Sequence, residues 1–283
     1  MSGRLDRDGF ELGYRIEGAG TNALVIGSSV YYPRTFSRNL REHLRLVFVD
    51  HRGFVPMPAD VPPRAFELDT ILEDTEHLRS SLELGAVVVI GHSGHAFMAL
   101  EYAKRFPQHV SHVVLIGCSP RLGPEAFAAA DRYWEESVDP VRKAVMAENL
   151  ARLPDSAFEG RPFSEFFVPF YLRNAPRFWF DPRFDASELW EGVVPNAIMG
   201  KIWGEDFARI DIATGLSALQ APVFLALGRY DFSVAPPSSW DPFRDRFREL
   251  TLRVFERSGH TPPYEEPALF DAELLSWLAS RTP

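Results

Sequence analysis

Short hydrophobic runs recur along the chain at intervals that favour buried β-strands. Each run is about six residues long, rich in Val, Ile, Leu and Phe, and bounded by glycine or charged residues, as expected in a parallel sheet. Ahead of these runs, Asp8-Gly9 separates two alternating segments and predicts the turn of a β-hairpin. The predicted strands cover residues 23–27, 45–50, 86–91, 112–117, 222–228 and 250–256.

Helical patterns lie between several of these strands. Residues 71–84 have helical periodicity, and a second helical pattern runs from Gly94 to Phe106 and stops before Pro107. Strands that alternate with helices require right-handed crossovers, which produce a mostly parallel sheet with helices on both faces. The hydrophobic pattern therefore predicts an α/β fold.

One long interval, residues 123–219, contains no predicted strand, and prolines recur through it. We expect a helical insertion there, with the chain divided into a core (1–121), a cap (122–219) and the rest of the core (220–283). Two arrangements of its aromatic residues are compatible with the sequence and with each other. In one they form a second small core, and in the other they line a lid over a hydrophobic pocket. Eleven of them fall within residues 158–190: Phe158, Phe163, Phe166, Phe167, Phe170, Tyr171, Phe178, Trp179, Phe180, Phe184 and Trp190.

Charge and composition narrow the possible partners. The 283 residues include 30 basic and 39 acidic side chains, for a net charge of −9, and no long cluster of Lys and Arg. Nucleic acids and anionic lipids both require a concentrated positive face, so we expect neither as a partner.

No apolar run is long enough to span a membrane. The first ten residues are charged where a secretory signal would be apolar, and Cys118 has no second cysteine with which to pair. We expect a cytoplasmic monomer or homodimer that acts on a small molecule.

The segment AVVVIGHSGHAFMALEYAKRF (86–106) predicts a buried strand, a tight turn and a helix, with Ser93 at the turn. A serine in that position is exposed on a strained backbone, and the helix N-terminus faces any negative charge that develops beside it. Gly91 and Gly94 allow the strand and helix to approach closely, whereas His95 stands where the G-x-S-x-G pattern has its second glycine. The segment thus predicts a nucleophilic serine.

A serine hydroxyl needs a histidine base and an acid that orients the base. Asp231 directly follows the strand predicted over 222–228, and His260 lies in the loop after the last strand. The chain order Ser, Asp, His is that of the triad found on open α/β sheets. We expect Ser93 to be the nucleophile, His260 the general base and acid, and Asp231 the residue that fixes the histidine tautomer.

On Gly91-His92-Ser93-Gly94, Asp231 and Ser258-Gly259-His260, the chain resembles the α/β-hydrolase superfamily over nearly its whole length. The resemblance implies the α/β-hydrolase fold, with a helical cap inserted between strands 6 and 7, and the triad above. VDHRGF (49–54) and GHTPPYEEP (259–267) are most similar to the proline-iminopeptidase-like branch. That branch commonly has a His-Gly-Gly-Pro-Gly loop where this chain reads IGSSVYYP (26–33), and a Trp where Gly94 stands. The resemblance implies the fold and the triad more strongly than it implies aminopeptidase activity.

Acyl transfer also needs two donors for the oxyanion, usually backbone N–H groups. Gly94 supplies the first, and the loop after the third strand supplies the second through Ser28 or, as an alternative, Ser29. Ser29, Tyr32 and His95 are candidate substrate contacts. The sequence shows no grouped metal ligands, so we expect neither a metal nor a cofactor. Further residues with expected structural positions are Cys118, a small buried residue, and Glu265 and Glu266, at the start of the last helix.

The function expected from these features is hydrolysis of a small, mainly hydrophobic ester or lactone through an acyl-enzyme. One alternative is a prolyl aminopeptidase, which would need carboxylates of the cap to bind the substrate ammonium group. Another is a ligand-binding or non-hydrolytic protein of the same fold. The carboxylates available in the cap are Glu135, Glu136, Glu165, Asp181, Glu188, Glu191, Glu205 and Asp206.

Overall fold

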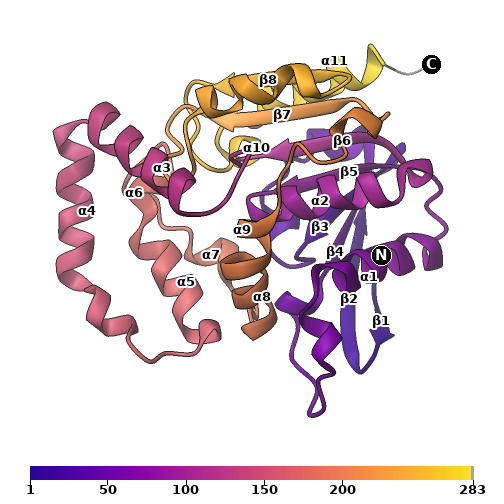
Figure 1. Ribbon diagram of the computed structural model, residues 1–283, viewed down its shortest axis with the longest axis horizontal. Coiled ribbons are helices and arrows are strands. Elements are labelled where there is room, and N and C mark those ends of the chain that lie inside the picture. Colours follow the sequence, from indigo (N-terminus) through magenta and orange to yellow (C-terminus); the bar gives the residue numbers. More distant parts are fainter. Residues whose placement is uncertain (282–283) are drawn as a thin grey trace.

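In the computed structural model, which describes residues 1–281, eight strands form one sheet in the order β1-β2-β4-β3-β5-β6-β7-β8 (Figure 1). From β3 to β8 the strands are parallel, whereas β1 and β2 pair antiparallel with each other and β2 pairs antiparallel with β4. The mostly parallel α/β fold is confirmed. The strands are β1 (Ser2–Arg7), β2 (Phe10–Glu17), β3 (Thr21–Gly27), β4 (Leu44–Asp50), β5 (Val87–His92), β6 (Val110–Ile116), β7 (Val223–Gly228) and β8 (Leu250–Phe255).

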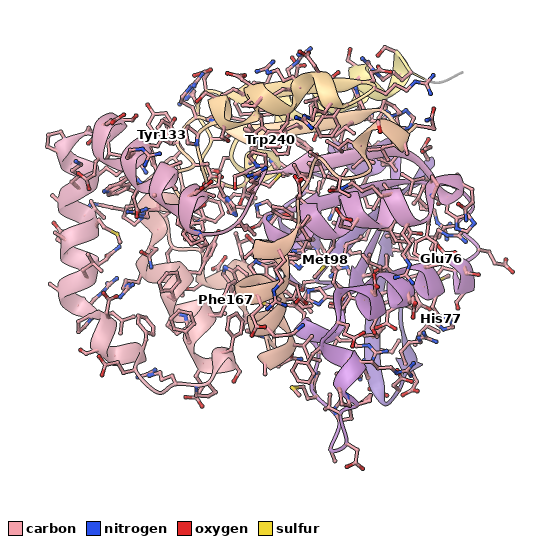
Figure 2. The ribbon with its side chains drawn as sticks, viewed as in Figure 1. Glu76, His77, Met98, Tyr133, Phe167 and Trp240 are labelled. Atoms are coloured by element: carbon pink, nitrogen blue, oxygen red, sulfur yellow. The ribbon has the colours of Figure 1, made fainter. Side chains whose placement is uncertain are left out.

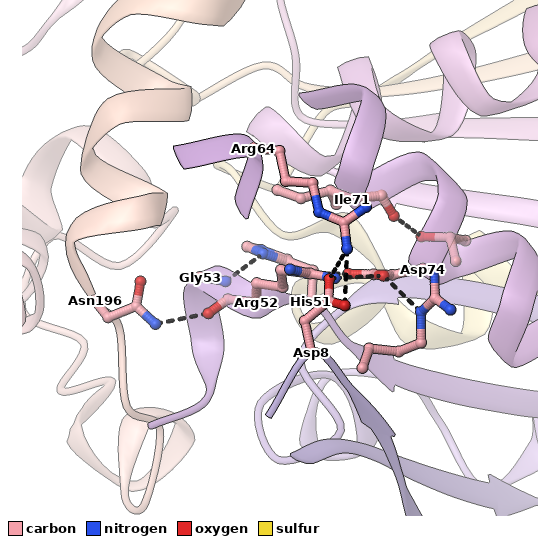
Figure 3. Close-up of polar contacts among 10 residues, drawn as sticks. Asp8, His51, Arg52, Gly53, Arg64, Ile71, Asp74 and Asn196 are labelled. Carbon is pink, nitrogen blue, oxygen red and sulfur yellow. Dashed lines mark hydrogen bonds and ion pairs between the residues drawn. The ribbon is translucent and has the colours of Figure 1, made fainter. Parts of the chain in front are cut away.

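The predicted hairpin joins β1 and β2. Asp8 and Gly9 have φ values of 54° and 82°, which are the positive angles that a two-residue hairpin turn requires. Asp8 also accepts hydrogen bonds from Arg52 and Arg64. Arg52 is completely buried, its guanidinium pairs with Asp74 as well, and Figure 3 shows this cluster. The turn is therefore fixed to the loop that follows β4.

Two hydrophobic clusters cover the two faces of the sheet. The first includes residues of α1 (Leu68–Ser81) and α2 (Gly94–Arg105), and the second includes residues of α11 (Pro267–Ala279). Helix α2 confirms the prediction for the segment after Ser93. Helix α1 begins before the predicted residue 71 and ends at Ser81, before the predicted 84. It ends early because Glu83 adopts a left-handed conformation with φ of 52° and cannot continue the helix.

The residues between β6 and β7 (117–222), which we call the helical insertion, contain no strand. Figure 1 shows α3 to α6 together at one end of the sheet, away from both chain ends. A π-helical turn, Ile202–Asp206, joins the last two helices of the insertion. Within residues 1–281, no helix combines the length and hydrophobicity needed to cross a membrane. The helices of the insertion are α3 (Pro124–Ser137), α4 (Pro140–Arg152), α5 (Phe163–Arg173), α6 (Ala175–Phe178), α7 (Ser187–Trp190), α8 (Ala197–Lys201) and α9 (Phe207–Arg209).

Candidate active site

Ser93 lies at the tight turn between β5 and α2. Its φ of 59° and ψ of −132° are strained for a residue with a side chain, and its N–H donates to the Ile116 carbonyl at 2.8 Å. A Cβ on Gly91 would collide with the backbone of His95, and a Cβ on Gly94 would collide with the indole of Trp203. The two glycines therefore permit this turn, as expected from the sequence.

Asp231 and His260 come together after β7 and β8. Both side chains are buried, and His260 Nδ1 lies 2.7 Å from Asp231 Oδ2. Ser233, which the sequence analysis did not single out, donates its hydroxyl proton to Asp231 Oδ1 at 2.5 Å and lies 3.2 Å from His260 Nδ1. With Nδ1 facing the carboxylate, the other ring nitrogen of His260, Nε2, is the one available to a neighbouring hydroxyl.

Ser93 and His260 line one cavity of about 680 Å³. The sheet contributes the turn at Ser93 and the loops at Ser28 and His260, while the insertion contributes mostly aromatic rings. Phe167 of α5, for example, lies on the side of that helix that faces α8 (Figure 2), and the two helices are in contact. The aromatic residues that the insertion contributes to the wall include Phe163, Phe166, Phe167, Phe170, Phe178 and Trp190.

The two candidate oxyanion donors in the loop after β3, Ser28 and Ser29, have different surroundings. Ser29 is bound to Asp50, because its N–H and its hydroxyl donate to the two carboxylate oxygens at 2.6 and 2.8 Å, and it is not part of the cavity wall. Burial raises the pKa of Asp50 to about 6. Ser28 lines the cavity, and its hydroxyl accepts the N–H groups of Val30 and Tyr31. Among the described residues its own N–H has no acceptor.

Of the three candidate substrate contacts, Ser29 does not line the cavity, whereas Tyr32 and His95 do. Their polar atoms bind each other, with 2.7 Å between the Tyr32 hydroxyl and His95 Nδ1. His95 Nε2 in turn lies 3.0 Å from His51 Nε2, and His92 Nε2 lies 2.9 Å from the His260 carbonyl oxygen. No spacing in the sequence indicates these pairs, because each forms between residues on different segments.

The position expected for Glu265 was wrong. This residue ends the short helix α10 (Pro262–Glu265), and α11 begins only at Pro267. Its carboxylate accepts the N–H groups of Phe180, Gly259 and Thr261 at 2.7 to 3.1 Å, and burial raises its pKa to about 7. Glu265 therefore joins the insertion to both sides of His260 instead of stabilising the N-terminus of the last helix.

A family model described as alpha/beta hydrolase fold matches residues 19–267. The chain belongs to this family. The "AB hydrolase superfamily protein YclE" of Bacillus subtilis (strain 168) is 40% identical over 281 residues, which are 98% of each chain. Among solved structures, the chain is similar to a proline iminopeptidase from Mycobacterium smegmatis (TM-score 0.72, 15% identity, 99% of this chain and 98% of that one). It is also similar to an esterase from Exiguobacterium antarcticum (TM-score 0.65, 20% identity, 96% and 97%). At these identities the two structures show the shared fold alone.

The charged residues of this α/β-hydrolase cavity are few. None of the eight cap carboxylates considered in the sequence analysis lines it. Asp155 does line the cavity, and it pairs with Arg173 at 2.7 Å. Arg177, which also lines the cavity, pairs with Asp131 at 2.8 Å. Cys118 is buried, which raises the pKa of its thiol. Across residues 1–281, no three His, Cys, Asp or Glu side chains are grouped as metal ligands. The hydrolase thus combines a polar site on the sheet with a largely apolar wall.

Proposed function

We propose that this α/β-hydrolase is a serine hydrolase that cleaves small, mainly hydrophobic esters or lactones. The observation that carries the proposal is the placement of Ser93 and His260 on the wall of one apolar cavity, with His260 Nδ1 bonded to Asp231. This supplies a nucleophile, a base and an orienting acid at a site that hydrophobic substrates can enter.

The reaction begins when Ser93 Oγ attacks the substrate carbonyl and His260 Nε2 accepts the serine proton. Asp231 accepts a hydrogen bond from the Nδ1–H of His260, which keeps His260 in the correct tautomer, and its negative charge stabilises the imidazolium that forms. His260 then protonates the leaving alcohol, which departs and leaves an acyl-enzyme on Ser93. A water molecule that loses its proton to His260 attacks this ester, and collapse of the second tetrahedral intermediate releases the acid and regenerates Ser93.

Two backbone N–H groups serve as donors to the oxyanion in this proposal. Gly94 is the first residue of α2, so its N–H belongs to the group at a helix N-terminus that has no intrahelical acceptor. The N–H of Ser28 has no acceptor among the described residues, whereas that of Ser29 is held by Asp50. These contacts favour Ser28 over Ser29 as the second donor.

The insertion serves as the cap in this proposal, because its aromatic rings form much of the cavity wall. An acyl or alcohol group that packs against Phe163, Phe167 and Trp190 loses contact with water, which favours binding by about 25 cal/mol per Å² of apolar surface. Hydrocarbon groups therefore suit this wall better than charged ones.

The alternative of an aminopeptidase is supported by the similarity to proline iminopeptidases. Such an enzyme must bind the ammonium group at the N-terminus of its substrate, and an unpaired carboxylate in the cavity would do so. Asp155 is already paired with Arg173, and the eight cap carboxylates named in the sequence analysis lie outside the cavity wall. The distribution of charge therefore favours the ester.

A panel of substrates separates the two reactions. We expect 4-nitrophenyl butyrate and hexanoate, or a medium-sized lactone, to be hydrolysed with kcat/KM at least about 100-fold above that of prolyl or leucyl 4-nitroanilide. Repeated turnover, beyond one equivalent of 4-nitrophenol per protein, distinguishes an enzyme from a binding protein. Preferred cleavage of the prolyl anilide would overturn the proposal in favour of the aminopeptidase.

A further inference from the structure

Beside the triad, four buried side chains form a continuous hydrogen-bonded series, which we call the histidine series: His51, His95, Tyr32 and His92. The bonds between successive members are 3.0 Å (His51 to His95), 2.7 Å (His95 to Tyr32) and 3.4 Å (Tyr32 to His92). The series ends on the carbonyl oxygen of His260, 2.9 Å from His92 Nε2. It therefore connects the loop after β4, the loop after β3, the turn at Ser93 and the loop that carries His260.

The proton positions at the first end follow from a backbone group. The N–H of Gly53 donates to His51 Nδ1 at 3.0 Å, so that nitrogen carries no proton (Figure 3). A neutral imidazole has one N–H, which in His51 must be at Nε2 and donates to His95 Nε2. The proton of His95 is then at Nδ1, from which it donates to the Tyr32 oxygen. The phenol proton of Tyr32 is therefore free to donate to an acceptor other than His95.

The proton positions at the other end follow from the His260 carbonyl, which can only accept. His92 Nε2 must therefore carry the proton that binds it, which leaves His92 Nδ1 as an acceptor. The Tyr32 hydroxyl lies 3.4 Å from both this nitrogen and the His92 carbonyl oxygen, so its proton has an acceptor on His92. The proton positions fixed from the two ends of the series agree at Tyr32, and every ring nitrogen of the series has a partner.

All three histidines of the series are held neutral by burial, which lowers the pKa of His51 to about 3 and lowers the pKa values of His92 and His95 well below the ordinary value. The bonds of the series involve no carboxylate and no arginine. Over the neutral pH range the series therefore keeps one arrangement of protons, and its members remain in one orientation.

From these contacts we infer that Tyr32 and His92 are positioning residues that hold the catalytic His260 against Ser93, an inference that rests on the proposed function. Both backbone groups of His260 are engaged, because its N–H donates to the Phe178 carbonyl at 2.5 Å and its carbonyl accepts from His92. Tyr32 begins a short 3₁₀-helix just after Ser28, so its hydroxyl also ties the oxyanion loop to the residues that flank Ser93. Small displacements of such groups cost large factors in rate.

Two buried tyrosines, Tyr32 in the series and Tyr102 outside the cavity, provide a matched test. Tyr32→Phe keeps the ring and removes the central hydroxyl of the series, so we expect kcat on a 4-nitrophenyl ester to fall about tenfold, with KM within about twofold of the wild type. Tyr102 of α2 is also buried, and its hydroxyl donates to Glu76, but it lies outside the cavity wall and its hydroxyl bonds no member of the series. Tyr102→Phe should therefore leave kcat within about twofold. Equal kcat values for the two variants would overturn the inference.

The His92 end is tested by a conservative rescue. His92→Leu removes the donor to the His260 carbonyl and should lower kcat about tenfold or more. His92→Gln restores an N–H near the position of Nε2, so it should recover most of that loss, whereas a purely structural requirement for an imidazole ring would leave the two variants equally slow. Equal rates would contradict the inference.

Imidazole ¹⁵N NMR on the histidine-labelled protein tests the series without any turnover. We expect His51 and His92 protonated at Nε2 and His95 protonated at Nδ1, with assignments from the single-residue variants. Finding His95 protonated at Nε2 would contradict the derived arrangement. A wild-type protein that hydrolyses none of the esters but shows these tautomers would refute the proposed function alone. An active wild type with equal Tyr32→Phe and Tyr102→Phe rates would refute the inference alone.

Discussion

The two sides of the cavity differ in how their side chains are held. On the sheet side, hydrogen bonds of 2.7 to 3.4 Å join His260 to Asp231 and join Tyr32 to both His95 and His92. On the insertion side, aromatic rings pack on one another: Phe167 stacks on Phe163 and meets Trp190 edge-to-face. Directional bonds fix geometry, whereas ring packing mainly sets shape and polarity. The sheet side therefore suits chemistry, and the insertion side suits the choice of substrate.

The largest expected effect comes from the sheet side. Ser93→Ala should lower kcat for every ester by about 10⁴-fold, regardless of chain length, because the proposed nucleophile is lost. The thermal midpoint should change little, since the Ser93 hydroxyl makes no hydrogen bond among the described residues and the strained backbone is retained. A large drop in the midpoint, measured by calorimetry, would instead indicate a structural serine.

A smaller effect, selective for substrate, is expected on the insertion side. Phe167→Ala should lower kcat/KM for 4-nitrophenyl octanoate about tenfold, because an apolar contact is lost, and should change the value for the acetate less than about twofold. Phe184→Ala is the matched control, since Phe184 is also half-buried in the insertion but packs on Trp179 and Tyr264 outside the cavity wall. Equal losses of kcat/KM for the acetate and the octanoate in Phe167→Ala would contradict the assignment of substrate choice to the insertion side.

The smallest effect concerns Glu265, which joins the two sides. Folding raises the pKa of Glu265 from 4.5 to about 7, so the folded protein favours the protonated carboxyl. The stability that this group contributes is fully present below pH 4.5 and is lost as the pH rises through about 7. The midpoint of Glu265→Gln, measured relative to that of the wild type, should therefore rise by a few degrees between pH 4.5 and 7.5.

Glu266→Gln is the control for this titration. The Glu266 carboxylate accepts from Arg257 N–H and the Ser258 hydroxyl, and the variant leaves Glu265 intact. The midpoint of Glu266→Gln should follow that of the wild type across the same pH range. If the difference in thermal midpoint between Glu265→Gln and the wild type does not change with pH, the pKa of Glu265 is not raised by folding in this way.

The fold was predictable because it depends on local patterns. The hydrophobic run of β5, the glycines around Ser93 and the turn at Asp8-Gly9 each carry their own signal within a few residues. The helical insertion was predictable for the same reason, since residues 123–219 lack any strand pattern. The limits of α1 were not, because the end of the helix depends on the left-handed Glu83, a conformation that no glycine or proline marks.

The candidate site was predictable only where chain order implies proximity. Asp231 and His260 follow strands that end at the same edge of the sheet, so their meeting follows from topology. The bond from His92 to the His260 carbonyl and that from Phe180 to Glu265 join residues 168 and 85 positions apart, with no spacing rule behind them. Such contacts depend on the packing of whole elements, which a single sequence does not encode in any short pattern.

The central claim, that Ser93 is an activated nucleophile in a substrate cavity, is tested most directly by covalent labelling. The folded protein is treated with a fluorophosphonate that carries an alkyl chain, and the adduct is located by peptide mass spectrometry. We expect one adduct, on Ser93, with rapid labelling in the wild type, and we expect the Asp231→Asn variant to be labelled at least about 100-fold more slowly. An unlabelled Ser93 in the folded wild-type protein, or equal labelling of wild type and Asp231→Asn, would contradict the account.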